Sequence, residues 1–336
     1  MLKPAHLFID ACSICQLRCK ECPATKMGYE YKVGRGYLKF KDFKKLTDLN
    51  PQIKSIEFDN YGELFLNPEL TDLIKYAYEK KIEVACSAGV NLNTVKPEVL
   101  EKLVKYQFRF LNCSIDGATN ETYRIYRVGG NFDTVIKNIE TINLYKKQYR
   151  SKFPQLQWQF IVFGHNEHEI PLARKMANNL NMKFYPKMNW NSNYSPIKNR
   201  EFVMAETGWH AVTREENERL SGINYVRPTC LSLWYSPRIN WDGRVTGCCW
   251  NVWSEFGGNV FTDGYNSCIN SEKIEYAKQM LLGLVEPKSD IPCVQCDIFH
   301  KIHHTGNFFT RTEIFRYLMK QRIIKFVKKT RSYFLS

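Results

Sequence analysis

The chain has 336 residues, of which 44% are hydrophobic and 14% aromatic, a composition that excludes a disordered protein and can supply a barrel-sized core plus a smaller module. No apolar stretch approaches the roughly 20 residues that span a bilayer, and the N-terminus lacks a signal peptide's apolar region, so we expect a cytoplasmic protein. The formal charge is +14, but residues 300–336 hold nine Lys or Arg against the single acid Glu313, so the basic excess lies mainly in this tail.

Residues 5–186 alternate β-rich segments with helical periodicity. Helices are predicted after Asn67-Pro68, read as an N-cap and a first-turn proline, after Asn131, and from Ile170. Alternation of this kind indicates parallel strands with helices outside them, and six units are too few for a closed eight-fold barrel. We therefore predict an α/β fold, a partial (β/α)6 barrel whose active site lies at the C-terminal ends of the strands. The six buried strands are predicted at HLFID, SIEFDN, IEVACS, FRFLNCSID, LQWQFIVF and MKFYPKM.

Residues 1–186 form the predicted barrel, and three further parts follow it. Residues 187–228 lose the strand–helix alternation and are interpreted as a linker with one helix at TREENERL. Residues 229–299 combine cysteines with turn signals, which is typical of a small loop-rich domain held by metal. Residues 300–336 form the basic C-terminal tail.

Three cysteines directly after the first strand are spaced for an iron–sulfur cluster. Cys15, Cys19 and Cys22 form C-x3-C-x2-C, and three thiolates on a cubane leave one iron open for a substrate or cofactor. Cys12 does not fit this spacing and is expected to be a small buried residue at the end of the strand. The alternative is a four-cysteine zinc knuckle that includes Cys12.

Four motifs, in order and each at a strand end, resemble those of the radical S-adenosylmethionine (SAM) superfamily. They are CQLRCKEC, NYGELFLNP, NCSIDGATNETYRIYR and FIVFGHNEHEIP, and together with the C-terminal module the resemblance covers nearly the whole chain apart from the tail. It implies a partial barrel of the radical SAM type. It also implies that the SAM-binding residues are Asn60, Gly62, Glu63, Ser114 and Val162, and that Asp116 and Arg127 are the best candidates for catalytic contact with the substrate.

The resemblance also implies a mechanism. A [4Fe–4S] cluster donates one electron into SAM at the open iron, which splits SAM into methionine and a 5′-deoxyadenosyl radical. That radical then removes a hydrogen atom from the substrate, while the protein orients the reactants and excludes water. The electron would come from a one-electron donor such as flavodoxin or ferredoxin.

A second cysteine group resembles the auxiliary-cluster domain of the SPASM/twitch type. Four cysteines would ligate a second, auxiliary [4Fe–4S] cluster completely, which suits electron transfer better than substrate binding. The shorter twitch form is expected because a full SPASM domain carries more cysteines. Cys249 or Cys268 can replace a named ligand, and a zinc ribbon is the alternative interpretation. The named ligands are Cys230, Cys248, Cys293 and Cys296.

Three functions follow from these motifs. The first is oxidation, or a related radical modification, of a small hydroxylated molecule such as a sugar or aminocyclitol, with the auxiliary cluster as electron acceptor. The second is radical modification of a ribosomally synthesised peptide. Such an enzyme would usually have an N-terminal peptide-recognition domain, and because the cluster motif begins at Cys15 we do not expect one here, which weakens this hypothesis. The third, from another class, is a zinc-stabilised binding protein without radical chemistry.

The basic tail has two interpretations. It is either a surface helix in peripheral contact with an anionic membrane or partner, or a terminal helix packed on the body. Nucleic acid is not an expected partner, because no recognised DNA- or RNA-binding motif accompanies the charge.

Overall fold

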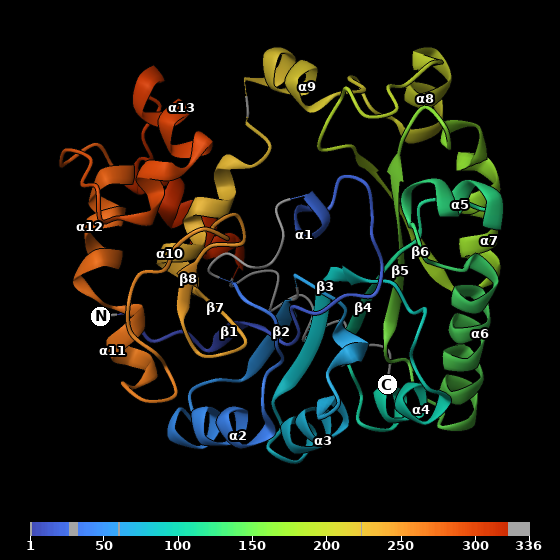
Figure 1. Cartoon of the computed structure of the whole chain (residues 1–336), viewed down its shortest axis with the longest axis horizontal. Helices are drawn as coiled ribbons and strands as arrows, with labels where there is room; N and C mark the ends of the chain where they lie inside the picture. The colour runs from blue at the N-terminus through green and yellow to red at the C-terminus, as the bar shows by residue number, and fades with distance from the viewer. Residues whose placement is uncertain (1, 27–32, 60, 223, 322–336) are drawn as a thin grey trace. The chain divides into compact units, whose positions relative to one another are not determined.

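The computed structural model describes residues 2–26, 33–59, 61–222 and 224–321 (Figure 1). By their internal contacts these residues divide into two compact units. The larger unit contains residues 5–225 and 240–242. The smaller unit contains residues 2–4, 226–239 and the described residues from 243 onward.

The larger unit is built on six parallel strands that lie side by side in chain order. Among the described residues β6 does not return to pair with β1, so the barrel is open, and the predicted partial (β/α)6 fold is confirmed. Each predicted strand is present. The bounds are β1 His6–Asp10, β2 Ser55–Asp59, β3 Glu83–Val90, β4 Phe110–Ser114, β5 Gln155–Val162 and β6 Met182–Met188.

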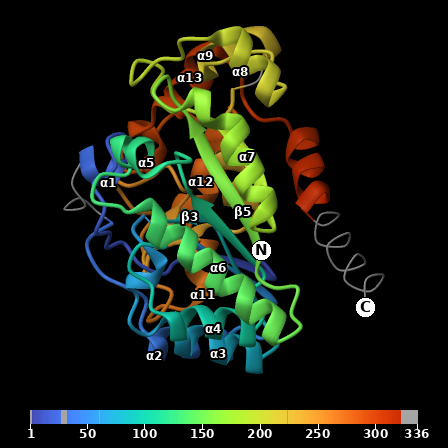
Figure 2. The same cartoon turned by 90° about the vertical axis from the view of Figure 1, so that its right-hand side faces the viewer.

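Helices cover one face of this sheet (Figures 1 and 2). The Phe43 ring of α2 lies 6.0 Å from that of Phe58 on β2, and the Phe132 ring of α6 lies 6.2 Å from that of Trp158 on β5. Neighbouring strand residues point to the opposite, inner face. The bounds are α1 Pro23–Lys26, α2 Phe40–Leu49, η1 Leu64–Leu66, α3 Leu70–Glu79, α4 Pro97–Lys105, α5 Asn120–Tyr126, α6 Phe132–Gln148, η2 Glu167–Glu169, α7 Ile170–Asn179, α8 Arg200–Thr207 and α9 Arg214–Ser221.

One predicted helix start is wrong. Helix α3 begins at Leu70 with Glu69 at its N-cap position, so Asn67 is not its N-cap. The Asn67 side-chain oxygen accepts from the Glu69 amide at 2.9 Å, and its side-chain amide donates to the carbonyl oxygens of Ala11 at 2.9 Å and Leu38 at 3.1 Å. The cap predicted at Asn131 is confirmed, since its side chain accepts from the amide of Thr134 at 2.9 Å.

The segment predicted as a linker contains two helices rather than one. The additional helix α8 starts after Asn199, whose side chain accepts from the amide of Phe202 at 3.0 Å, and it ends at Gly208 in a left-handed conformation. Up to Tyr225 this segment belongs to the larger unit.

The smaller unit consists of short helices around a two-stranded antiparallel hairpin. Its bounds are η3 Arg227–Leu231, α10 Ser232–Tyr235, β7 Arg238–Ile239, β8 Val245–Gly247, α11 Tyr265–Ile269, α12 Glu272–Leu281, η4 Pro292–Gln295 and α13 Asp297–Thr305.

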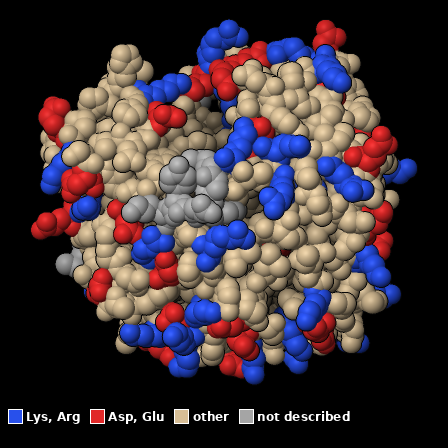
Figure 3. All heavy atoms as spheres, in the orientation of Figure 1, with Lys and Arg blue, Asp and Glu red and all other residues tan. Residues whose placement is uncertain are grey.

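The structure describes only part of the basic tail. Residues 311–321 are helical, whereas residues 322–336 lie outside the described residues. On the face drawn in Figure 3, basic and acidic side chains are interspersed. Within the described part of the chain, no helix combines the length and the apolar character needed to cross a bilayer.

Candidate functional site

The structure brings the three predicted cluster cysteines together in the loop that follows β1. Cys19 belongs to a buried apolar group, and Cys15 and Cys22 pack against it. Burial, with smaller contributions from nearby Glu63, Cys19 and Cys22, raises the pKa of the Cys15 thiol to about 12. The other buried members of this group are Leu17, Tyr126, Ile161 and Phe163.

Cys12 interacts with the backbone and does not belong to this group of three cysteines. It is fully buried, forms a β-bridge with Tyr37, and directs its sulfur toward the carbonyl oxygen of Ile14 at 3.6 Å. The expectation of a small buried residue at the end of the first strand is confirmed.

Gly62 and Glu63 extend from β2 alongside the cluster loop. The Gly62 amide donates to the carbonyl oxygen of Cys12 at 3.1 Å, and the Glu63 amide donates to that of Ile14 at 2.7 Å. A Cβ atom on Gly62 would overlap the Ile14 carbonyl group, so only glycine fits here. Asn60, the other residue predicted in this motif, lies outside the described residues.

The Glu63 carboxyl group is almost fully buried at 1% exposure. Its two oxygens accept from the amides of Asn91 at 2.7 Å and Phe65 at 3.4 Å, yet burial dominates and raises its pKa to about 7. A buried carboxylate with two amide donors and no cation bonded to it is suited to receive an ammonium group.

Asp116 and Arg127 form an ion pair. Arg127 Nε donates to Asp116 Oδ2 at 2.6 Å, and the carboxylate side chain is fully buried. Arg127 Nη1 also lies 3.5 Å from the sulfur of Cys19. The two candidates for substrate contact therefore lie against the cluster loop.

Ser114 and Val162 end β4 and β5, at the edge where the carboxyl ends of the parallel strands meet. Ser114 is 5% exposed, and its hydroxyl accepts from the Gln159 amide at 3.4 Å. Val162 is 2% exposed and pairs with Met188 on β6. Their roles toward SAM stay predictions.

A row of hydrogen-bonded polar side chains crosses the inner face of the sheet. Ser87 Oγ donates to Glu57 Oε1 at 2.5 Å, and the Asn112 amide donates to the Ser87 carbonyl oxygen at 3.0 Å. The Gln159 Oε1 atom accepts from Asn112 at 3.1 Å and from Lys187 Nζ at 3.2 Å. This row joins β2 to β6, and the sequence analysis did not identify it although strand alternation places Gln157 and Gln159 on one face.

Strand β3 leaves this inner face open. It lies between β2 and β4, yet Ser87 and Ala88 are exposed, and Ala85 and Gly89 are only half-buried. A central strand with only small residues on one side marks a place where another molecule can approach the backbone closely.

Aromatic rings adjoin the cysteine loop. Tyr126 lies 4.6 Å from Phe163, and the His165 ring stacks on Phe163 at 5.0 Å with an interplanar angle of 13°. Tyr194 completes the group, 5.5 Å from Phe163. The sequence analysis did not identify Tyr126, Phe163 or Tyr194, because single aromatic residues in strands and helices usually signal a core.

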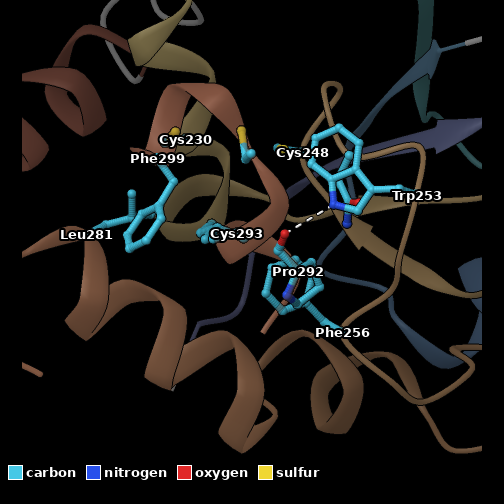
Figure 4. A pocket seen from close by; sticks show the side chains of 11 residues that line it. Cys230, Cys248, Trp253, Phe256, Leu281, Pro292, Cys293 and Phe299 are labelled. Carbon is cyan, nitrogen blue, oxygen red and sulfur yellow. Dashed lines mark hydrogen bonds between the residues drawn. The ribbon is translucent and has the colours of Figure 1, made fainter. Parts of the chain in front are cut away.

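The second cysteine group lines one cavity in the smaller unit. Figure 4 shows Cys230, Cys248 and Cys293 between Phe299 on one side and Trp253 on the other, where Trp253 Nε1 donates to the Pro292 carbonyl oxygen at 3.1 Å. The remaining lining residues are Leu233, Asn251, Phe256, Leu281 and Cys296. All four predicted ligands therefore meet in one apolar cavity.

Backbone amides point at two of these sulfurs. Burial raises the pKa of the Cys248 thiol to about 12, while the amides of Trp250 and Asn251 oppose the increase. Burial also raises the pKa of Cys296, and the amides at the start of α13 oppose it. Amide groups that lower the cost of a thiolate are what an iron–sulfur cluster requires.

Cys249 and Cys268 do not line this cavity. Cys268 is buried in α11, where its sulfur lies against Gly258. Cys86 and Cys113 are fully buried in β3 and β4, as the sequence predicts for core residues.

Both cysteine groups fit a cubane cluster. In the described ranges, no group of three or more His, Cys, Asp or Glu side chains is arranged to hold a single metal ion. A [4Fe–4S] cluster takes its thiolates at separate corners, and here they come from buried loops with apolar walls. Cys15, Cys19 and Cys22 would hold one cluster and the second group another.

Residues 11–170 match the radical SAM superfamily. The enzymes of this superfamily use a [4Fe–4S] cluster and SAM as cofactors. This match includes the first cysteine group, Gly62, Glu63, Ser114 and Val162.

Two characterised proteins are similar in sequence. The antilisterial bacteriocin subtilosin biosynthesis protein AlbA of Bacillus subtilis is 24% identical over 290 residues, which are 80% of this chain and 60% of AlbA. The AdoMet-dependent heme synthase of Methanosarcina barkeri is 27% identical over 173 residues, 51% of this chain and 46% of the synthase. The chain thus spans about half to three-fifths of the length of these relatives.

Among solved structures, SuiB of Streptococcus suis bound to its precursor peptide SuiA has the same fold. The TM-score is 0.58 at 14% identity, and the match covers 88% of this chain and 70% of SuiB.

Proposed function

We propose that the protein cleaves SAM reductively and uses the resulting 5′-deoxyadenosyl radical to abstract a hydrogen atom from a peptide. The observation that carries this proposal is the convergence of Cys15, Cys19 and Cys22 beside Gly62 and Glu63 within the matched domain. When bound, the cluster supplies the electron and SAM supplies the radical, so the protein binds, orients and excludes water.

Different residues of the chain bind the cluster and bind SAM. The three thiolates hold a cluster with one corner free, and Glu63 accepts hydrogen bonds from the methionine ammonium group of SAM. Ser114 and the Val162 backbone hold the rest of SAM at the ends of β4 and β5. The aromatic rings of Tyr126, Phe163 and Tyr194 keep water away from this corner of the site.

A peptide substrate is supported by AlbA, which acts in bacteriocin biosynthesis, and by SuiB, which was solved with a precursor peptide. The polar inner face of the sheet supplies amide, hydroxyl and ammonium groups to a hydrogen-bonding substrate. The earlier hypothesis of a sugar or aminocyclitol stays a prediction that this polar face also accommodates, but the similar proteins support it less.

The smaller unit would hold the auxiliary cluster. Cys230, Cys248, Cys293 and Cys296 line a cavity walled by Trp253, Phe256 and Phe299, so we assign it an electron-accepting role. A flavodoxin or ferredoxin as donor, and contact of the basic tail with an anionic membrane, belong to the same proposal.

Iron and sulfide analysis after anaerobic purification tests the cofactor assignment. If the protein holds two cubanes, we expect about eight irons per chain. We also expect an EPR signal that changes on addition of SAM, and formation of 5′-deoxyadenosine with a chemical reductant. A protein that contains zinc alone and releases no 5′-deoxyadenosine would contradict it.

Mass spectrometry tests the substrate class. The reduced enzyme is incubated separately with short peptides encoded beside its gene and with aminocyclitols. A mass change in a peptide supports the proposal, whereas a product formed only from an aminocyclitol would restore the alternative hypothesis.

A further inference from the structure

The guanidinium group of Arg127 lies between a carboxylate and a cysteine sulfur. Its Nε donates to Asp116 Oδ2 at 2.6 Å, and its Nη1 lies within 3.5 Å of Cys19 Sγ. Because the guanidinium is planar and rigid, the contact with Asp116 fixes the direction in which Nη1 points.

Asp116 is itself held firmly. Its other oxygen, Oδ1, accepts from the amide of Ile161 at 2.7 Å, and its backbone carbonyl accepts from the side chain of Asn166 at 3.1 Å. The carboxylate therefore ties α5 and its C-terminal Arg127 to β5. Both carboxylate oxygens of Asp116 thus accept a hydrogen bond from within the protein.

The position of Arg127 favours a charge effect on Cys19. Its side chain is only 13% exposed, so water screens its charge weakly. An arginine guanidinium stays protonated in proteins. A permanent cation thus faces the sulfur of a predicted cluster ligand.

We infer that Arg127 sets the reduction potential of the SAM-binding cluster through its N–H contact with Cys19, and that the negative charge of the paired Asp116 carboxylate partly offsets the charge of Arg127. This inference rests on the proposed ligation of the cluster by Cys19. Reduction adds negative charge to the cluster, so a nearby cation and a hydrogen bond to a ligand sulfur both favour the reduced form. Removing the cation should lower the potential, and removing the carboxylate should raise it.

The test is an EPR-monitored redox titration of the anaerobically reconstituted full chain. In Arg127→Gln the reduction equilibrium should shift about tenfold toward the oxidised form, which is about 59 mV for a one-electron couple. Asp116→Asn should shift it the opposite way. Arg124→Gln, which removes an exposed cation from the same helix, is the matched control and should leave the potential unchanged. The auxiliary cluster, whose signal does not respond to SAM, is an internal reference.

The outcomes separate the inference from the proposed function. If the wild-type protein has no cubane signal that responds to SAM, the proposed function fails and the inference fails with it. If that signal is present and Arg127→Gln retains both its iron and the wild-type potential, the inference alone is overturned. Weaker SAM binding with an unchanged potential would place the role of Arg127 on SAM and would also overturn it. If Arg127→Gln does not assemble a cluster, Asp116→Asn decides, and an unchanged or lowered potential there contradicts the inference.

Discussion

Glu63 and Ile14 are joined backbone to backbone, because the amide of Glu63 donates to the carbonyl oxygen of Ile14 at 2.7 Å. This hydrogen bond continues the pairing of β1 and β2 beyond the ends of both strands. It binds the segment that carries Gly62 to the loop that carries the cluster cysteines, so each part of the SAM site fixes the position of the other.

Gly62→Ala should therefore disrupt the cluster loop. The added Cβ would overlap the Ile14 carbonyl group and force the two segments apart, at a cost on the order of 2 kcal/mol in the free energy of unfolding. The iron content should fall from about eight to about four per chain, as measured colorimetrically. Gly208→Asn is the control, because nothing lies within 4 Å of that position and Asn tolerates its left-handed conformation. Unchanged iron in Gly62→Ala would show that the loop tolerates the displacement.

Cys19→Ala should abolish SAM cleavage, because it removes one of three thiolates from the open cluster. Cys12→Ala should keep that activity and lose only about 1 kcal/mol of stability, because Cys12 is a buried core residue. The measurement is 5′-deoxyadenosine by chromatography after reduction. Equal loss of metal in both variants would instead support the four-cysteine zinc knuckle.

Cys293→Ala should remove the auxiliary cluster and leave the first one intact. Iron should fall to about four per chain, 5′-deoxyadenosine should still form, and modification of the substrate should be lost. Cys249→Ala and Cys268→Ala should retain their iron, because neither residue lines the cavity. Iron loss in either control would identify it as a ligand.

Stability should depend on pH through His165. Burial lowers the pKa of His165 to about 4, whereas an unfolded histidine titrates near 6.5, at about its usual pKa. Between these values the unfolded state binds more protons, so this contribution to stability is complete above about pH 6.5 and falls as the pH decreases toward 4. The melting temperature of His165→Gln should therefore fall less steeply over this range than that of the wild type. His210→Gln, at an exposed position, should follow the wild-type profile.

The strands were predictable from sequence because their signal is local. HLFID and MKFYPKM coincide with β1 and β6, since β-branched and aromatic residues bounded by polar turns describe a strand without reference to the rest of the chain. The first cysteine group was also predictable, because its C-x3-C-x2-C spacing is a local property, whereas the second group was predicted from its resemblance to an auxiliary-cluster domain. The metal-binding roles stay predictions.

Relations between distant segments were not predictable. Asn67 has the local pattern of a helix cap, but it bonds to Ala11 and Leu38, which are 56 and 29 residues away. The Arg127–Cys19 contact joins residues 108 apart. Periodicity identifies faces and spacing identifies ligands, but neither indicates which side chains meet across the fold.

The small side chains on the inner face of β3 have a consequence for how selectivity can change. Ser87 is exposed on a central strand whose other face, with Val84 and Cys86, is buried. Enlarging Ser87 would narrow the space above the sheet without altering the cysteine loops or the helix packing. Under the proposed function, a larger side chain at this position would exclude bulky substrates while the three cluster cysteines, Gly62 and Glu63 stay unchanged.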